Sequence, residues 1–151
     1  YSGTVSAAME GAILGYRSFA VSLCLDLSHE VPDMTETAKY TMELIEKLYE
    51  IDMPKNIIYN INLPCASISQ LAGTVFTSSG IRKYSDKYIS RKDPWGKTYY
   101  WLSGSPINDQ VYNHNDTDIE HMKNNHVTIV PMSYDLTDYA ALQKLKGVKL
   151  D

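Results

Sequence analysis

Ser2, Gly3 and Thr4 form a short polar stretch directly before a predicted helix. The first turn of a helix contains backbone N–H groups without partners in the helix, and the helix dipole adds positive charge there. Such a helix end binds phosphate and other anions well. Gly3 lets the backbone approach a ligand closely, and the hydroxyls of Ser2 and Thr4 can donate hydrogen bonds. On spacing alone, simple helix capping by the hydroxyls is the first interpretation of the stretch, and a phosphate site is the alternative.

Other residues that could carry chemistry give weaker signals. Metal-binding spacings such as HxxxH and HxH do not occur among the four histidines, which are His29, His114, His121 and His126. Three acids could bind a hard cation, but the dipole of a following helix is the better explanation for them: Asp116, Asp118 and Glu120. The sequence contains neither a GxxxxGK[ST] phosphate loop nor a GxSxG elbow. It does not indicate nucleophilic catalysis, and we expect the histidines to lie on the surface or in loops.

Residues 81–97 carry an excess of positive charge on a chain whose net charge is −4. The six basic side chains are Arg82, Lys83, Lys87, Arg91, Lys92 and Lys97. This patch can attract phosphorylated ligands, although the solvated faces of an exposed hairpin explain it equally well. Tyr99, Tyr100 and Trp101 can likewise stack on a base or pack in a subunit contact. The acidic overall balance argues against a stable nucleic-acid partner.

The composition is that of an ordinary globular domain. The 151 residues, 44% hydrophobic and 21% charged, are enough for one domain or a large part of one. No apolar run approaches membrane-spanning length, so we expect no membrane partner. Cys24 and Cys65 lie far apart, and we expect them to be buried free thiols in a reducing compartment. The cytoplasm is therefore the expected location.

The first half of the chain predicts alternating helices and strands. A helix ends near Gly15, and the apolar run 19–25 is typical of a central parallel strand. A second helix follows Pro32 and Asp33, with an apolar face of Met34, Ala38, Met42, Ile45 and Leu48. The next strand is Ile57–Leu63. This alternation predicts an α/β sheet with helical crossovers, and because the chain opens on a helix without the strand that begins such a unit, we expect its first residue to be a cut edge.

From about Thr74 the sequence consists of β-branched and aromatic segments separated by turn residues. This change predicts a core in residues 1–73 and a hairpin arm with a C-terminal region in residues 74–151. A turn at Asp93–Gly96 joins the strand before it to residues 97–102 in a long hairpin. We then expect a polar loop over 105–116, a short helix over 118–125 and a strand over 126–130. The last predicted helix covers 138–146, with Thr137 as its cap.

Taken in order, several segments resemble the SurE survival-protein family of metal-dependent 5′/3′-nucleotidases. They are YSGTVSAAMEGAILG, AVSL, NINLP, DPWGKTYYWLSG, TDIEHMKNNHVTIVPM and DLT. The matching segments span nearly the whole chain, from Tyr1 to Thr137. Ser6 departs from the family pattern, because a glycine is common there, and residues 27–32 match nothing diagnostic.

The resemblance implies a hydrolase that removes phosphate from nucleoside 5′- and 3′-monophosphates, with activity on other phosphate esters or polyphosphate. It implies part of a Rossmann-like three-layer α/β core with parallel strands, followed by an extended β-hairpin and a C-terminal region that builds homodimers or homotetramers. In the family pattern the stretch matching Ser2, Gly3 and Thr4 binds phosphate.

The same resemblance implies a divalent metal, Mg²⁺ or Mn²⁺. In the family pattern its ligands are a paired Asp-Asp, a Ser and an Asn, and none of these has a matching position here. We therefore expect the ligands to lie outside this chain and the chain alone to be inactive. The alternative function is a non-catalytic module for phosphate binding or oligomerisation.

Overall fold

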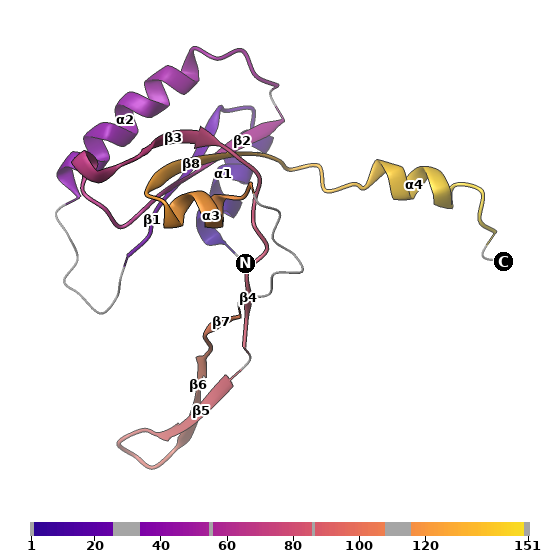
Figure 1. The fold of residues 1–151 in the computed structure, drawn as a ribbon. Coiled ribbons are helices and arrows are strands. Elements are labelled where there is room, and N and C mark those ends of the chain that lie inside the picture. Colours follow the sequence, from indigo (N-terminus) through magenta and orange to yellow (C-terminus); the bar gives the residue numbers. More distant parts are fainter. Residues whose placement is uncertain (1, 26–33, 55, 86, 108–115, 150–151) are drawn as a thin grey trace.

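The computed structural model describes residues 2–25, 34–54, 56–85, 87–107 and 116–149 (Figure 1). The helices are α1 (Gly3–Ile13), α2 (Thr35–Tyr49), the 3₁₀ turn η1 (Ile68–Gln70), α3 (Asp118–Lys123) and α4 (Tyr139–Leu145). The strands are β1 (Ser18–Leu23), β2 (Ile57–Leu63), β3 (Gly73–Phe76), β4 (Lys83–Tyr84), β5 (Lys87–Lys92), β6 (Thr98–Ser103), β7 (Pro106–Ile107) and β8 (His126–Ser133).

A four-stranded sheet in the order β1-β2-β8-β3 forms the core. β1 and β2 are parallel, as are β3 and β8, whereas β2 and β8 are antiparallel. The expected parallel pairing is confirmed for the first two strands, and the whole sheet is mixed. β1 has β2 as its one neighbour among the described strands, and the predicted central position of β1 stays a prediction. β3 and β8 complete the sheet, because β8 pairs with both β2 and β3, and the division into residues 1–73 and 74–151 stays a prediction.

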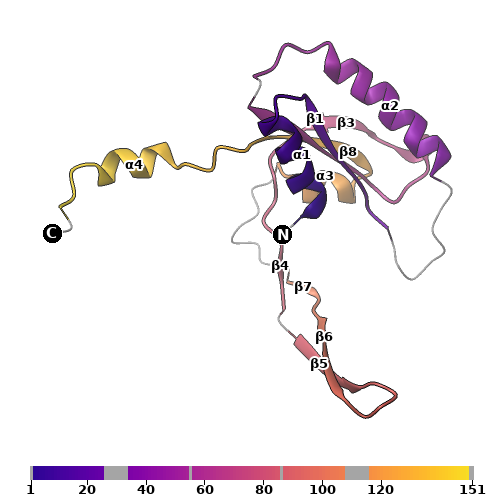
Figure 2. The same ribbon diagram turned by 180° about the vertical axis from the view of Figure 1, so that it is seen from behind.

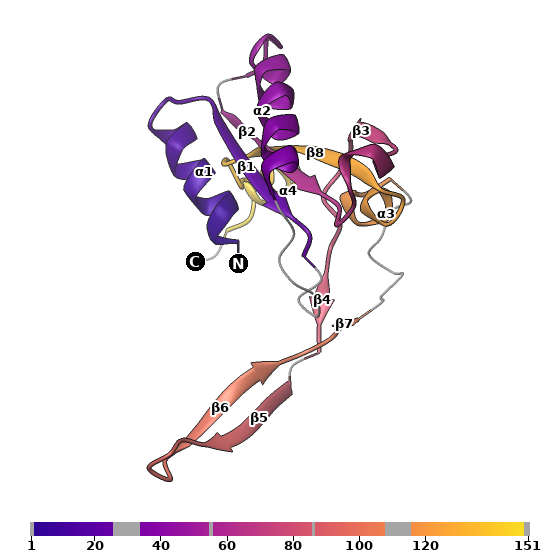
Figure 3. The ribbon, with the colours of Figure 1, turned by 90° about the vertical axis from the view of Figure 1, so that its left-hand side faces the viewer.

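Helices cover both faces of the sheet, which gives three layers (Figure 3). On one face, Leu48 of α2 packs with Tyr59, Ile61 and Leu63, the alternate residues of β2. On the other face, Ala8 and Ala12 of α1 pack with Ala20 and Ile58. α1 lies close to β1, because a Cβ on Gly11 would approach the Ser18 Oγ to 2.6 Å. Successive strand residues point to opposite faces, so each strand serves both layers.

The buried face of α2 differs from the predicted one. Ile45 and Leu48 pack on the core as expected, but Met34 and Met42 are exposed. Thr41 is buried instead, and its hydroxyl donates to the Thr37 carbonyl at 2.7 Å. Because that bond satisfies the hydroxyl within the helix, a threonine can occupy the core face at little cost.

A hairpin arm projects from the core (Figures 1 and 2). β5 and β6 pair antiparallel around the predicted turn, and β4 and β7 pair at the root of the arm. Asp93 fixes the turn, because its carboxylate accepts the backbone N–H of Trp95 at 3.0 Å and of Lys97 at 2.8 Å. Gly96 adopts φ of 84°, the left-handed region that suits glycine. The predicted hairpin is confirmed.

The C-terminal helix α4 extends away from the sheet (Figures 1 and 2). Its cap is Asp138 rather than the predicted Thr137, since the Asp138 carboxylate accepts the Ala141 N–H at 2.9 Å. Within the described residues, no helix has both the length and the apolar character needed to cross a membrane.

Two further expectations concern the cysteines and the segments outside the described residues. Cys24 and Cys65 are free, as predicted, but both are exposed, so the prediction of burial was wrong. They follow the ends of β1 and β2, where the chain leaves the sheet. His29, His114, the Pro32–Asp33 helix start and most of the 105–116 loop lie outside the described residues.

Candidate phosphate-binding site

The tip of α1 combines a cap with free backbone donors. Ser2 is the N-cap, and its Oγ accepts the Val5 N–H at 3.2 Å. The Ser6 hydroxyl donates to the Ser2 carbonyl at 2.8 Å. The N–H groups of Gly3 and Thr4 have no partner among the described residues. The two interpretations of this stretch are therefore compatible, because capping uses an oxygen lone pair and leaves these N–H groups available to an anion.

A hollow of about 410 Å³ lies beside this tip. Ser2 and Val5 line it from α1, and the sheet contributes Ser22, Asn60 and Asn62. Ser22 pairs with Asn62 across β1 and β2, and the alternation of β2 turns both asparagines toward the α1 layer. The hydroxyls and carboxamides on this face of the sheet provide hydrogen-bond donors for a polar ligand.

The remaining wall comes from the segment after β3 and from α3. The residues of this wall are Ser79, Gly80, Arg82, Asp118, Ile119 and Met122. The Asp118 carboxylate accepts the Gly80 N–H at 2.8 Å, and the Asp118 N–H donates to the Ser78 carbonyl at 2.9 Å. These two bonds attach the segment that carries Arg82 to the start of α3.

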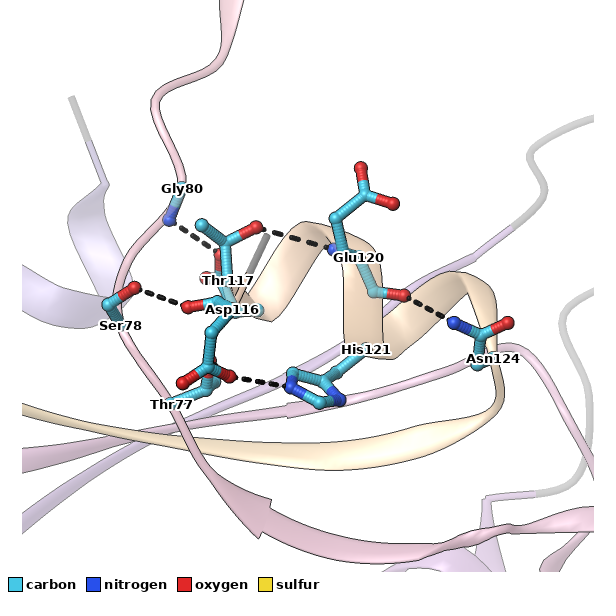
Figure 4. A network of polar contacts seen from close by, with 9 residues as sticks. Thr77, Ser78, Gly80, Asp116, Thr117, Glu120, His121 and Asn124 are labelled. Atoms are coloured by element: carbon cyan, nitrogen blue, oxygen red, sulfur yellow. Dashed lines mark hydrogen bonds and ion pairs between the residues drawn. The ribbon is translucent and has the colours of Figure 1, made fainter. Parts of the chain in front are cut away.

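Asp116 makes a second attachment between the same two segments (Figure 4). One of its carboxylate oxygens lies 3.2 Å from the Thr77 hydroxyl and 2.8 Å from the His121 Nε2. The Ser78 hydroxyl donates to the Asp116 carbonyl at 2.5 Å. Hydrogen bonds from His121 and then from Thr77 hold the pKa of the Asp116 carboxyl below its usual value, because they stabilise the ionised form.

We expect Asp116→Asn to reduce the loss of stability in acid. The Asp116 carboxyl has a lower pKa in the folded chain than its ordinary value of 3.8, so its ionised form stabilises the fold at any pH above 3.8. This contribution to stability is lost as the pH falls through the lower pKa of the folded chain. The measurement is the melting temperature from neutral pH down to about pH 2, the range in which such a carboxyl titrates. Equal acid sensitivity in parent and variant would contradict the assignment.

Some of the predicted site residues lie at the hollow, together with residues that were not predicted. Ser2 lines the hollow, and Gly3 and Thr4 stand at the helix tip next to it. Arg82 of the predicted basic patch also lines it. Ser22, Asn60 and Asn62 were missed, although polar residues that alternate with apolar ones in a buried strand were a signal for them.

The acids and histidines near α3 contact other side chains of the described residues. Glu120 forms an ion pair with Lys123 at 2.6 Å, and His121 contacts the ring of His126 at a centroid distance of 5.5 Å. Across the described part of the chain, no group of three or more His, Cys, Asp or Glu side chains is placed to hold a metal ion. These residues therefore do not fit a metal centre.

Comparison with known proteins matches residues 1–86 to the family described as Survival protein SurE. The chain is 42% identical over 147 residues to a 5′-nucleotidase SurE from Thermosynechococcus vestitus, covering 96% of this chain and 54% of that protein. It is 34% identical to a 5′-nucleotidase SurE from Alkaliphilus metalliredigens, covering 100% of this chain and 58% of that protein.

Among solved structures, the chain is similar to the crystal structure of a SurE protein from Aquifex aeolicus. The TM-score is 0.74 at 32% identity, covering 97% of this chain and 57% of that one. The chain thus spans somewhat more than half the length of the relatives it matches.

Proposed function

The chain belongs to the survival protein SurE family, and from this premise we propose that the hollow beside α1 is the phosphate site of a nucleotidase. The reaction is removal of phosphate from nucleoside 5′- and 3′-monophosphates, with other phosphate esters or polyphosphate as further substrates. The observation that carries the proposal is the α1 tip beside a polar hollow, where the N–H groups of Gly3 and Thr4 have no partner within the part of the chain that the structure describes. The names of the relatives support the same substrate class.

The helix tip stabilises the charge of the reacting group. The N–H groups of Gly3 and Thr4 and the Ser2 hydroxyl donate to phosphoryl oxygens, whose charge changes during transfer. Donors held in place by a folded helix need little reorganisation at the moment of reaction. The carboxamides of Asn60 and Asn62 orient the ester from the floor of the hollow.

A divalent cation, Mg²⁺ or Mn²⁺, completes the proposed activity. Its ligands are expected outside this chain, and among the described residues no three His, Cys, Asp or Glu side chains are grouped to hold a metal ion. The experiment measures phosphate release from nucleoside monophosphates by the full-length protein with and without each cation. Metal-dependent release supports the nucleotidase, whereas phosphate binding without any release favours a non-catalytic module.

Thr4→Ala is expected to lower kcat/KM about fivefold, because it removes one hydroxyl donor worth about 1 kcal/mol. The first turn of α1 stays capped, since the cap hydroxyl belongs to Ser2. Steady-state kinetics with a nucleoside monophosphate check this, with melting temperature as the control for folding. An unchanged kcat/KM would show that the Thr4 hydroxyl does not contact the substrate.

The proposal includes a homodimer or homotetramer. Large apolar side chains are exposed on the arm, with Trp95 at 88% and Trp101 at 59%, and beyond the sheet Leu136 is exposed at 86% and Leu145 at 62%. Exposed apolar surface of this kind marks interaction sites. Light scattering of the full-length protein tests the assembly, and a monomer at all concentrations would contradict it. A cytoplasmic location stays a prediction, to be tested by cell fractionation.

A further inference from the structure

Arg82 is placed to supply positive charge to the hollow. It is the one lysine or arginine among the described residues that line it, and the other polar lining groups are hydroxyls, carboxamides and one carboxylate. Arg82 has no hydrogen-bond or ion-pair partner among the described residues. The other donors that line the hollow are neutral, and a guanidinium matches two phosphate oxygens with a fork of charged donors.

Asp118 lines the same hollow. Its Oδ1 is already engaged, because it accepts the Gly80 N–H at 2.8 Å. The segment runs tightly against α3 at this point, since a Cβ on Gly80 would come within 2.6 Å of the Ile119 Cδ1 and 3.1 Å of the Asp118 Oδ1. Arg82 follows Gly80 by two residues. The bond to Asp118 therefore fixes the backbone from which the Arg82 side chain reaches the hollow.

From this geometry we propose that Arg82 binds the phosphoryl group opposite the α1 tip, and that Asp118 is the positioning residue that holds Arg82 there. The inference rests on the proposed function for its substrate, although phosphate binding can be measured without turnover. Two segments far apart in the sequence then bind one ligand: residues 2–4 through backbone N–H groups and Arg82 through its guanidinium group.

The first test uses the full-length protein with Arg82→Gln and Arg82→Lys. Loss of one charged hydrogen bond costs about 1.5 to 3 kcal/mol, so Arg82→Gln is expected to lower kcat/KM for a nucleoside monophosphate by roughly 10- to 150-fold. Arg82→Lys keeps the charge and loses the fork, and we expect a loss of about tenfold. The matched control is Arg91→Gln on β5, which removes the same charge from the arm and is expected to change kcat/KM less than twofold.

The second test examines positioning. Asp118→Ala is expected to raise KM about tenfold, whereas Asp118→Asn keeps an acceptor oxygen and restores most of the activity. In the double variant with Arg82→Gln, loss of Asp118 should add less than twofold, because the residue acts through Arg82. A purely structural Asp118 would instead give additive losses. Circular dichroism confirms that each variant is folded.

Calorimetric titration with inorganic phosphate separates this inference from the proposed function. If the parent binds phosphate but releases none from nucleotides, the nucleotidase proposal fails, and the weaker phosphate binding expected of Arg82→Gln still supports the role of Arg82. If Arg82→Gln binds phosphate within twofold of the parent, the role of Arg82 is overturned. Additive losses in the double variant, or no rescue by Asp118→Asn, overturn the role of Asp118.

Discussion

Gly3→Asp is expected to lower kcat/KM for nucleoside monophosphates by at least about 100-fold while the fold remains intact. A new carboxylate at the α1 tip would face the phosphate, and like charges about 4 Å apart repel by about 4 kcal/mol at an effective dielectric constant of 20. The fold can accept the side chain, because a Cβ on Gly3 meets no atom within 4 Å. An acid in the first helical turn also interacts favourably with the dipole, by about 0.3 to 1 kcal/mol.

Gly3→Asn is the matched control for this effect. Asparagine has nearly the same shape as aspartate and no charge, so we expect kcat/KM within about fivefold of the parent. The melting temperature should be unchanged in Gly3→Asn and unchanged or raised in Gly3→Asp. Equal losses in the two variants would indicate steric blocking, and normal activity in both would show that phosphate does not bind at this helix end.

Ile61→Ala is expected to destabilise the chain by about 2 to 5 kcal/mol, the usual range for truncating a large buried side chain. Ile61 is fully buried on β2, where it pairs with Val21 on one side and Ile129 on the other. It belongs to the α2 layer of the core, on the face of the sheet opposite the hollow. We therefore expect kcat for the folded fraction to change little, measured at a temperature below the transition.

Urea unfolding gives the measurement, with Ile13→Ala as the control. Ile13 is 58% exposed at the end of α1, so the same substitution there should cost no more than about 0.5 kcal/mol. Similar losses at the two positions would contradict the assignment of the core to this face of β2.

Helices and strands were predictable where local patterns decide the structure. Ser2 before α1, Gly15 after it and the Asp93–Gly96 turn are local signals, and each element formed where the sequence indicated. The phase of α2 was less predictable, because a satisfied Thr41 hydroxyl occupies a core position that hydrophobicity assigns to its neighbour Met42. The cap of α4 was also ambiguous from sequence, since both Thr and Asp favour that position.

Pairing between distant strands could not be predicted from local patterns. β8 enters the sheet between β2 and β3 after the whole arm has intervened, and nothing in residues 126–133 specifies their neighbours. The hollow depends on the same long-range arrangement. Ser2 signals an anion site by itself, but Asn62 and Arg82 join it only because the sheet and α3 bring the three segments to one place.

The most direct measurement is a crystal structure of the full-length protein with a nucleoside monophosphate or its phosphate product bound. We expect the phosphoryl oxygens within hydrogen-bond distance of the N–H groups of Gly3 and Thr4, with the Arg82 guanidinium on the opposite side of the group. A phosphate bound away from the α1 tip, with those N–H groups facing only solvent, would contradict the proposed site.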